Sequence, residues 1–380
     1  MSVQTQWLGG QLGEMEQALA ALVELNSFTD NPEGGRKVGG LLREAFAIEG
    51  LSSEVVKSQR FADHLVFRSA GDQAKGAVAM LGHLDTVFPP GKFEGYRVDG
   101  ELRRGPGVLD MKGGLVVVAW ALKSIARTVG LGKVPPLRIV VVADEEVGSP
   151  EGKLIIERVI ADCRRCLVFE SGRINDAIVT QRKGTGSITV TAHGKAAHAG
   201  NNHADGANAL WALSRFVDRV QALTDYARGI TVNVGKVTGG QGKNTVPDLA
   251  VAELDIRFQT KGDSLWLMEQ VQAAAQAAGA SISGTRLTVD PGPSRLPMER
   301  SDASVALMQE YAACATAHGL AADESPRVGG GSDACTSSAM GIPSIDALGP
   351  RGRGFHTVDE YIEVKTLVSR AQALAEFLLR

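Results

Sequence analysis

Short apolar segments alternate with helical patterns along much of this chain, and this alternation limits the folds that it can adopt. Residues 77–81, 137–143 and 165–169 are short and largely apolar or β-branched, whereas apolar residues recur at helical spacing in 11–26, 36–49 and 113–126. Apolar runs of strand length are typical of strands covered on both faces. The alternation therefore predicts an α/β fold in which helices cover a largely parallel sheet.

The middle of the chain has a different pattern. Strands of alternating polarity and two amphipathic helices follow in the order β-α-β-β-α-β, at residues 187–192, 206–223, 231–238, 250–260, 263–278 and 285–290. This order is that of a ferredoxin-like α+β unit. Helix–strand alternation then returns, with helices at 301–318 and 364–380 and a strand at 343–348. We predict a first domain formed by 1–182 and 294–380, into which 183–293 is inserted.

Composition excludes several classes of protein. The chain has 380 residues, of which 44% are hydrophobic, and a net charge of −3. This charge implies no broad attraction to nucleic acid or to an anionic membrane. No apolar run reaches the ~18 residues that a membrane span needs, and no signal-peptide pattern is visible. Four cysteines are too few for a disulfide framework, so we expect a soluble cytoplasmic protein.

Ionisable residues follow several of the predicted strands or stand on adjoining loops. They are His83, Asp85, Asp110, Glu145, Glu146, Glu170 and His356. Each alone has an ordinary explanation, such as a helix cap, a solvated acidic turn or a surface histidine. Together they place imidazole and carboxylate groups at one edge of one sheet, where open α/β sheets bind ligands.

A mixed set of two histidines and three acids suits zinc. Five such groups, His83, Asp110, Glu146, Glu170 and His356, are too many for one closed structural site. They suit two ions that share a carboxylate, as in two-metal hydrolases. Glu145 and Glu146 are consecutive, so one of them can bind metal while the other transfers a proton.

Seven motifs in this order resemble those of a known family. They are GHLDTV, GPGVLDMKGG, DEEVGS, the FES strand end, GKAAHAG, GGGSDA and FHTVDEY. The chain resembles the co-catalytic di-zinc exopeptidases and aminoacylases, which include glutamate carboxypeptidase, acetylornithine deacetylase and succinyl-diaminopimelate desuccinylase, and it is most similar to the glutamate carboxypeptidase branch. The resemblance implies an α/β/α catalytic domain with an inserted lid domain through which two copies form a homodimer.

The resemblance also implies roles for the site residues. His83, Asp110 and Glu170 would bind one zinc ion, and Asp110, Glu146 and His356 the other, with Co²⁺ or Mn²⁺ as possible substitutes. Asp85 would orient His83. Glu145 would be the general base for attack by a metal-activated hydroxide, and His198 would stabilise the oxyanion, from its own subunit or across the dimer.

The implied substrate is a small molecule with a free carboxylate, bound by Asn244, Arg257 and Gly330 or Gly331. The implied reaction is cleavage of an amide bond to a C-terminal amino acid. An N-acyl (N-acetyl) amino-acid deacylase is the alternative, and a catalytically silent binding protein on the same scaffold fits less well because no ligand is lost. In the loop before His356, Arg351 or Arg353 could recognise an acidic substrate, and Arg295 is another candidate for that role.

Overall fold

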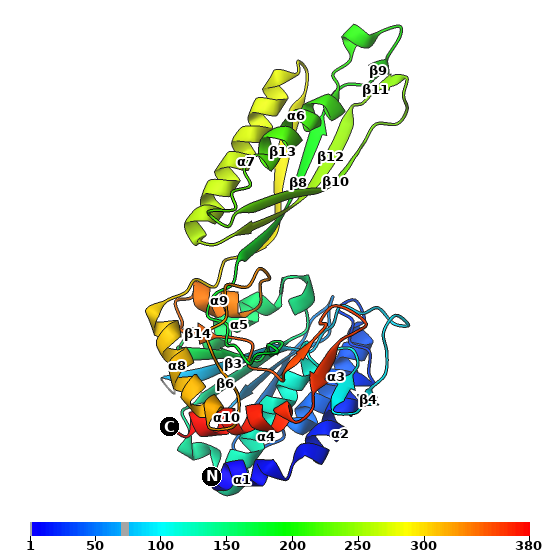
Figure 1. The fold of residues 1–380 in the computed structure, drawn as a ribbon. Coiled ribbons are helices and arrows are strands. Elements are labelled where there is room, and N and C mark those ends of the chain that lie inside the picture. The colour runs from blue at the N-terminus through cyan, green and yellow to red at the C-terminus, as the bar shows by residue number, and fades with distance from the viewer. Residues whose placement is uncertain (1, 70–75) are drawn as a thin grey trace. The chain divides into compact units, whose positions relative to one another are not determined.

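The computed structural model describes residues 2–69 and 76–380, and it divides into two compact units. The large unit comprises Met1–Gln181, Arg300–Val328 and Ser332–Arg380, and the small unit comprises Arg182–Glu299 and Gly329–Gly331. Each unit has its own hydrophobic core, so each is described separately (Figure 1).

A six-stranded mixed sheet forms the centre of the large unit. Its order is β1 (Ser52–Val56), β2 (His64–Arg68), β6 (Leu137–Val142), β3 (Ala77–His83), β7 (Cys163–Val168) and β14 (Ser344–Ile345). The pairs from β6 to β14 are parallel, as predicted. The pairs made by β2 with β1 and β6 are antiparallel. Residues 57–63 between β1 and β2 are too few for a parallel crossover, which requires about a dozen residues or more.

Helices cover both faces of this sheet. One layer contains α1 (Val3–Gly9), α2 (Leu12–Val23), α3 (Pro32–Ala45), α4 (Lys112–Thr128), α8 (Asp302–Thr316) and α10 (Thr366–Leu378), and the opposite layer contains α5 (Gly152–Ile160) and α9 (Ala334–Ala339) (Figure 1). Helix α4 is buried on nearly its whole circumference. Such a helix belongs at the centre of a core rather than at a surface.

A second, smaller sheet in the large unit was not predicted. Its order is β15 (Gly352–Arg353), β16 (Tyr361–Glu363), β5 (Leu102–Arg104) and β4 (Arg97–Asp99). Strands of two or three residues are too short to show a periodic pattern. This sheet brings loop 354–360 next to loop 105–110.

The small unit has the ferredoxin-like topology that the sequence predicts. Its antiparallel sheet has the order β10 (Thr231–Gly239), β12 (Leu249–Phe258), β8 (Gly184–His193) and β13 (Arg286–Arg295). Helices α6 (Ala209–Gln221) and α7 (Lys261–Ser281) pack against each other and against this sheet. A short ladder of β9 (Ala197–His198) and β11 (Thr245–Val246) is added at one side.

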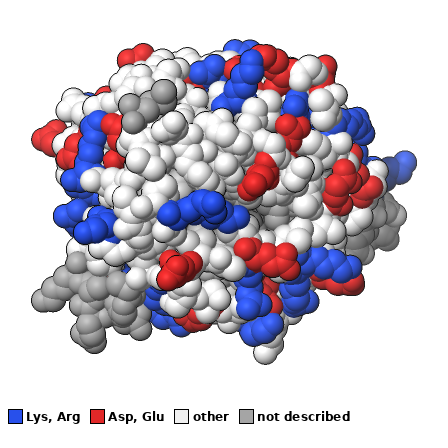
Figure 2. All heavy atoms as spheres, turned by 90° about the horizontal axis from the view of Figure 1, so that it is seen from below, with Lys and Arg blue, Asp and Glu red and all other residues white. Residues whose placement is uncertain are grey.

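The described residues contain no helix that combines the length and hydrophobicity of a membrane span. On the face shown in Figure 2, the described acidic and basic side chains are interspersed rather than gathered by sign. This face therefore offers no extended field of one sign to a charged partner.

Candidate metal centre

The five side chains predicted as metal ligands lie together at one edge of the large unit. His83 ends β3, and Glu146 and Glu170 follow β6 and β7. Asp110 precedes α4, and His356 lies in the loop between β15 and β16. Parallel neighbours β6, β3 and β7 end at the same edge of the sheet, which brings together residues that are far apart in sequence.

Asp110 lies between the two histidines. Its Oδ1 is 3.3 Å from Nε2 of His83, and its Oδ2 is 3.4 Å from Nε2 of His356. Nε2 of His83 is also 3.6 Å from Glu170 Oε1, and Nε2 of His356 is 3.0 Å from Glu146 Oε2. The five side chains thus form two groups, each with one histidine and one glutamate, that share Asp110.

These separations fit the donor set of a metal pair. Donor atoms bound tetrahedrally at about 2.1 Å from one zinc ion lie about 3.4 Å from each other. The nitrogen–oxygen distances of 3.0 to 3.6 Å in the two groups bracket this value. The described residues therefore present imidazole and carboxylate groups with a spacing that suits a pair of metal ions.

The electrostatics of the site also favour a bound cation. Burial raises the pKa of Glu146 to about 7. Burial, together with the charge of Asp110, raises the pKa of Glu170 well above its usual value. Hydrogen bonds to Asp110 and Glu146 raise the pKa of His356 to about 10. Without a metal ion, the negative charges of the buried carboxylates are neutralised by protons on the glutamates and histidines of the site. A divalent ion would replace those protons.

Two of the three predicted catalytic residues, Glu145 and Asp85, join this group. A carboxylate oxygen of Glu145, a donor from His83 and one from Glu170 all lie within 4.8 Å of one another. The backbone carbonyl of Asp85 is 3.0 Å from Nδ1 of His83, and the Asp85 carboxylate is 3.4 Å from the same nitrogen. Asp85 therefore contacts the ring nitrogen of His83 that faces away from Asp110.

Asp85 has further partners that the sequence did not indicate. Its carboxylate accepts hydrogen bonds from the backbone N–H groups of Glu145 and Glu146, each at 3.2 Å, and from the Thr29 hydroxyl at 2.8 Å. Asp85 and Thr29 are buried, and Glu145 and Glu146 are half-buried. One side chain thus links the histidine at the end of β3 to the acidic turn after β6.

Glu360 is a supporting residue that sequence reasoning missed. Its buried carboxylate accepts hydrogen bonds from the backbone N–H groups of Gly107, Leu109 and Asp110, at 3.1, 2.8 and 3.0 Å. The charge of Glu360 also acts on the buried Lys112, whose ammonium donates to the Leu22 carbonyl at 3.0 Å. The FHTVDEY motif contains Glu360, but nothing in that motif indicates contacts about 250 residues away.

A tight turn carries His356. Gly354 has φ +82°, and a side chain there would come within 2.7 Å of the Asp359 carbonyl oxygen. The Thr357 N–H donates to the Gly354 carbonyl at 3.0 Å, and His356 itself has φ 63°. Only glycine fits this backbone without strain at position 354, which explains the glycine beside the predicted ligand.

The other predicted residues belong to the small unit. Nδ1 of His198 accepts hydrogen bonds from the N–H groups of Gly200 and Asn201, both at 3.1 Å. In the neutral ring the proton must then be on Nε2, so His198 presents a hydrogen-bond donor. Thr245 pairs with His198 across the β9–β11 ladder, which places Asn244 at the same end of the unit.

Arg257 already has an acidic partner. Its guanidinium donates two hydrogen bonds of 2.8 Å to the carboxylate of Asp255 on the same strand. The Gly330 carbonyl accepts from Arg182 at 3.2 Å, and Gly331 lies against the buried Arg295. The small unit therefore groups Gly330 and Gly331 with Arg182 and Arg295.

Of the two arginines before His356, one has a structural role. Arg351 donates to Asp176 and to Glu363 at 2.9 Å each, with a second bond to Asp176. These hydrogen bonds connect three segments of the large unit. These bonds give Arg351 a structural role in the large unit, and its recognition of an acidic substrate stays a prediction.

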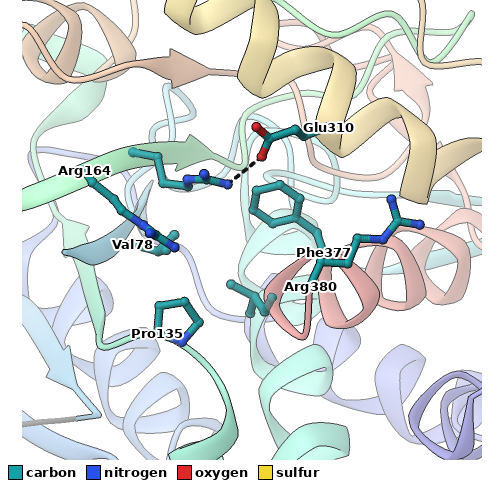
Figure 3. Close-up of a pocket in the computed structure, with 8 residues that line it drawn as sticks. Val78, Pro135, Arg164, Glu310, Phe377 and Arg380 are labelled. Carbon is teal, nitrogen blue, oxygen red and sulfur yellow. Dashed lines mark hydrogen bonds and ion pairs between the residues drawn. The ribbon is translucent and has the colours of Figure 1, made fainter.

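A cavity of about 310 Å³ lies away from these residues. Its lining includes Val78, Arg164, Arg165 and Glu310, and Arg165 donates to Glu310 at 2.8 Å (Figure 3). Val78 and His83 lie at opposite ends of β3, about 16 Å apart at the usual rise of a strand. This cavity contains none of the predicted site residues.

The comparison with known families agrees with this geometry. The model of peptidase family M20/M25/M40 matches residues 79–380. The chain belongs to this family. The resemblance found in the sequence is thereby confirmed, and membership of M20 implies a metallohydrolase of the peptidase and amidohydrolase type with a dinuclear metal site.

Individual M20 relatives cover nearly the whole chain. It is 26% identical to carboxypeptidase G2 of Pseudomonas sp. (strain RS-16) over 369 residues, which cover 96% of this chain and 88% of that protein. It is 27% identical to a succinyl-diaminopimelate desuccinylase of Acidiphilium cryptum over 390 residues, covering 94% and 96%. The structure of a tripeptidase from Staphylococcus aureus has a TM-score of 0.80 at 21% identity, covering 97% and 98%, which confirms the M20 fold.

Proposed function

We propose that this M20 protein is a di-zinc hydrolase that cleaves the amide bond to a C-terminal amino acid, as a carboxypeptidase does. The observation that carries the proposal is the position of Asp110, which offers one carboxylate oxygen to each of two histidine–glutamate groups. The similarity to carboxypeptidase G2 over 96% of the chain supports the choice of reaction.

The proposed ligand groups are His83, Asp110 and Glu170 for one ion and Asp110, Glu146 and His356 for the other. When bound, the zinc pair would supply Lewis-acid chemistry, polarising the amide carbonyl and acidifying a water molecule. Glu145 takes the proton of this water and later delivers it to the departing amine. Asp85 supports this step because it holds both the imidazole of His83 and the backbone of Glu145.

We assign recognition of the substrate to the small unit, Arg182–Glu299 and Gly329–Gly331, acting as a lid. His198 donates its Nε2–H to the oxyanion, which agrees with the hydrogen bonds that its Nδ1 accepts. Asn244, Arg257 and the backbone of Gly330 or Gly331 bind the free carboxylate. Asp255 occupies Nε and Nη2 of Arg257, which leaves the Nη1 donors for the substrate carboxylate.

An N-acyl amino-acid deacylase is the second candidate. The similarity to a succinyl-diaminopimelate desuccinylase, which covers 94% of the chain, favours it. The two activities use the same metal pair and the same Glu145, and they differ in the acyl group that the enzyme prefers.

We also propose a homodimer formed through the small unit. Strand β10 is an edge of its sheet, and α6 beside it exposes Leu210 and Trp211, the latter with 53% of its surface accessible. An open strand edge beside an exposed aromatic residue is a common dimer surface. Sedimentation should give the mass of two chains, and W211E should shift it toward one.

The free thiols of all four cysteines support a cytoplasmic location.

Substrate panels test the proposed reaction. Zinc-loaded protein should hydrolyse folate-type, N-acetyl or dipeptide substrates that carry a free carboxylate, and a chelator should abolish turnover. E145Q should bind zinc as the wild type does and lose about 10²- to 10⁴-fold in kcat, as is usual when a general base is removed. Near-normal turnover by E145Q would contradict the mechanism, and inactivity toward the whole panel would contradict the function.

A further inference from the structure

A second cavity, of about 340 Å³, adjoins the candidate metal centre in the large unit. Leu109, Ser171 and Phe355 line it, and each is the immediate sequence neighbour of a proposed metal ligand. The Phe355 ring also meets the His356 ring edge-on, with centroids 5.3 Å apart. The wall of the cavity therefore belongs to the same loops that carry three of the proposed ligands.

The walls of this cavity are held by close backbone packing. The Gly349 N–H donates to the Glu170 carbonyl at 3.0 Å, and a side chain at Gly172 would come within 2.3 Å of the Gly349 carbonyl oxygen. Arg351 fastens the same loop through its bonds to Asp176 and Glu363. The loops that line the cavity are thus fixed by their own contacts, as is usual for small-molecule sites.

Arg353 gives the cavity its chemical character. It is exposed on β15 and lines the cavity. Within residues 2–69 and 76–380, no hydrogen bond or ion pair is recorded for its side chain, in contrast to Arg351. Ile174 and Phe355 add partly exposed apolar surface. An apolar wall with a guanidinium fits a short hydrocarbon chain that ends in a carboxylate, because the guanidinium fork matches a carboxylate.

We propose that Arg353 is a specificity residue that recognises a carboxylate at the far end of the substrate's acyl group. Preferred substrates then carry the acyl group of a dicarboxylic acid. This inference rests on the proposed function, which assigns the amino-acid carboxylate to Asn244 and Arg257 and leaves the cavity of the large unit for the acyl group.

The test compares two ligands that differ only in the distal carboxylate, N-succinyl-L-glutamate and N-butyryl-L-glutamate. Calorimetry on the zinc-loaded E145Q protein should show tighter binding of the succinyl compound. Adding R353A should lower the succinyl-to-butyryl affinity ratio about tenfold or more. R353Q, which keeps the length of the side chain without the charge, should do the same, and R353K should fall between.

R43A is the matched control, because Arg43 is an exposed arginine on α3 and its removal changes the net charge equally. It should leave the ratio unchanged. A wild-type ratio near one, a ratio unaffected by R353A and R353Q, or tighter binding of N-benzoyl-L-glutamate than of the succinyl compound would each overturn the inference.

Turnover separates the inference from the function on which it rests. If binding depends on Arg353 as expected but the wild-type enzyme hydrolyses neither amide, the carboxylate site stands and the proposed function fails. If both amides are hydrolysed with equal kcat/KM and bound equally, the proposed function stands and the role of Arg353 fails.

Discussion

Asp85 joins three segments of the large unit through one buried carboxylate. It accepts hydrogen bonds from Thr29 and from the backbone of Glu145 and Glu146, and it lies beside His83. A residue with these contacts acts through the groups that it positions. Its replacement should therefore affect the metal centre and the proposed general base together.

We expect D85N to reduce zinc affinity and kcat/KM about 10- to 100-fold, the usual cost of removing a group that orients a metal ligand. The asparagine side chain has one acceptor oxygen, whereas the Asp85 carboxylate has two. One of the backbone N–H groups of Glu145 and Glu146 therefore loses its hydrogen-bond acceptor. Zinc titration with a competing chelator measures the first effect, and steady-state kinetics measures the second.

D30N is the control for D85N. Asp30 is exposed and follows Thr29, so its replacement removes the same charge close by without touching the centre. Equal effects of the two substitutions, or no effect of D85N, would contradict the positioning role of Asp85.

At the scale of elements, a sheet of very short strands holds the metal loops. Glu360, in the turn before β16, fastens the 107–110 backbone, while β15 and β16 flank the loop that carries His356. Arg103 of β5 then ties this sheet to Glu16 of α2. The precision of the centre thus depends on elements that contribute no ligand.

E360Q should destabilise the large unit by about 1–3 kcal/mol and weaken zinc binding. One amide oxygen replaces two carboxylate oxygens, and the amide N–H₂ then opposes a buried backbone N–H. Chemical denaturation and zinc titration measure the two effects. D359N, at the exposed neighbour Asp359, should be neutral in both, and an equally neutral E360Q would refute the role of Glu360.

The pair of Glu16 and Arg103 should give stability that depends on pH. Hydrogen bonding from Arg103 is the main reason that the pKa of Glu16 lies below its usual 4.5. A carboxylate with a lowered folded pKa stabilises the fold above the unfolded pKa and loses this effect as the pH falls through the folded value. The contribution is therefore present at neutral pH and disappears in acid.

E16Q should thus lose about 1 kcal/mol at pH 7, a value reduced by the partial exposure of the pair. The difference from wild type should shrink toward zero below pH 4. Urea unfolding at several pH values measures this trend, and E14Q, an exposed glutamate on the same helix, should show little difference. A difference that grows in acid would contradict the assignment.

At the scale of the whole molecule, the metal pair should stabilise the large unit against unfolding. Four of its proposed ligands follow or precede elements of the central core, and burial raises the pKa values of Glu146 and Glu170 when no cation is bound. Ions that bind only the folded state stabilise it by mass action, by about 2.7 kcal/mol per site at one hundred times Kd.

A chelator should therefore lower the Tm of the large unit by several degrees, and added Zn²⁺ should restore it. Scanning calorimetry follows this change, and it can separate the transition of the small unit, which holds none of the proposed ligands. H83A should lack most of the response. If neither chelator nor zinc changes the Tm of the large unit, the folded state does not bind a metal pair.

Much of the fold follows from local patterns. The apolar run 137–143 and the helix at 113–126 are buried as predicted, and the alternation in residues 250–260 gives the ferredoxin-like sheet its inner face. Patterns of this kind report which side of a strand or helix meets the core. They do not report strands of two or three residues, so the β15-β16-β5-β4 sheet was missed. The five residues of β1 were also missed, because none of them is fully buried and they show no apolar run.

The sequence by itself determined where the proposed ligands His83, Glu146 and Glu170 stand, since each lies at or just after the end of a strand that its own neighbours form. Only the tertiary structure decided which side chains of the site contact one another. In the folded chain, each carboxylate oxygen of Asp110 contacts one histidine, Arg351 forms an ion pair with Asp176, and Arg353 lines the cavity. The reason is physical: direction along a strand is local, whereas contacts between residues about 250 positions apart exist only once the core has packed.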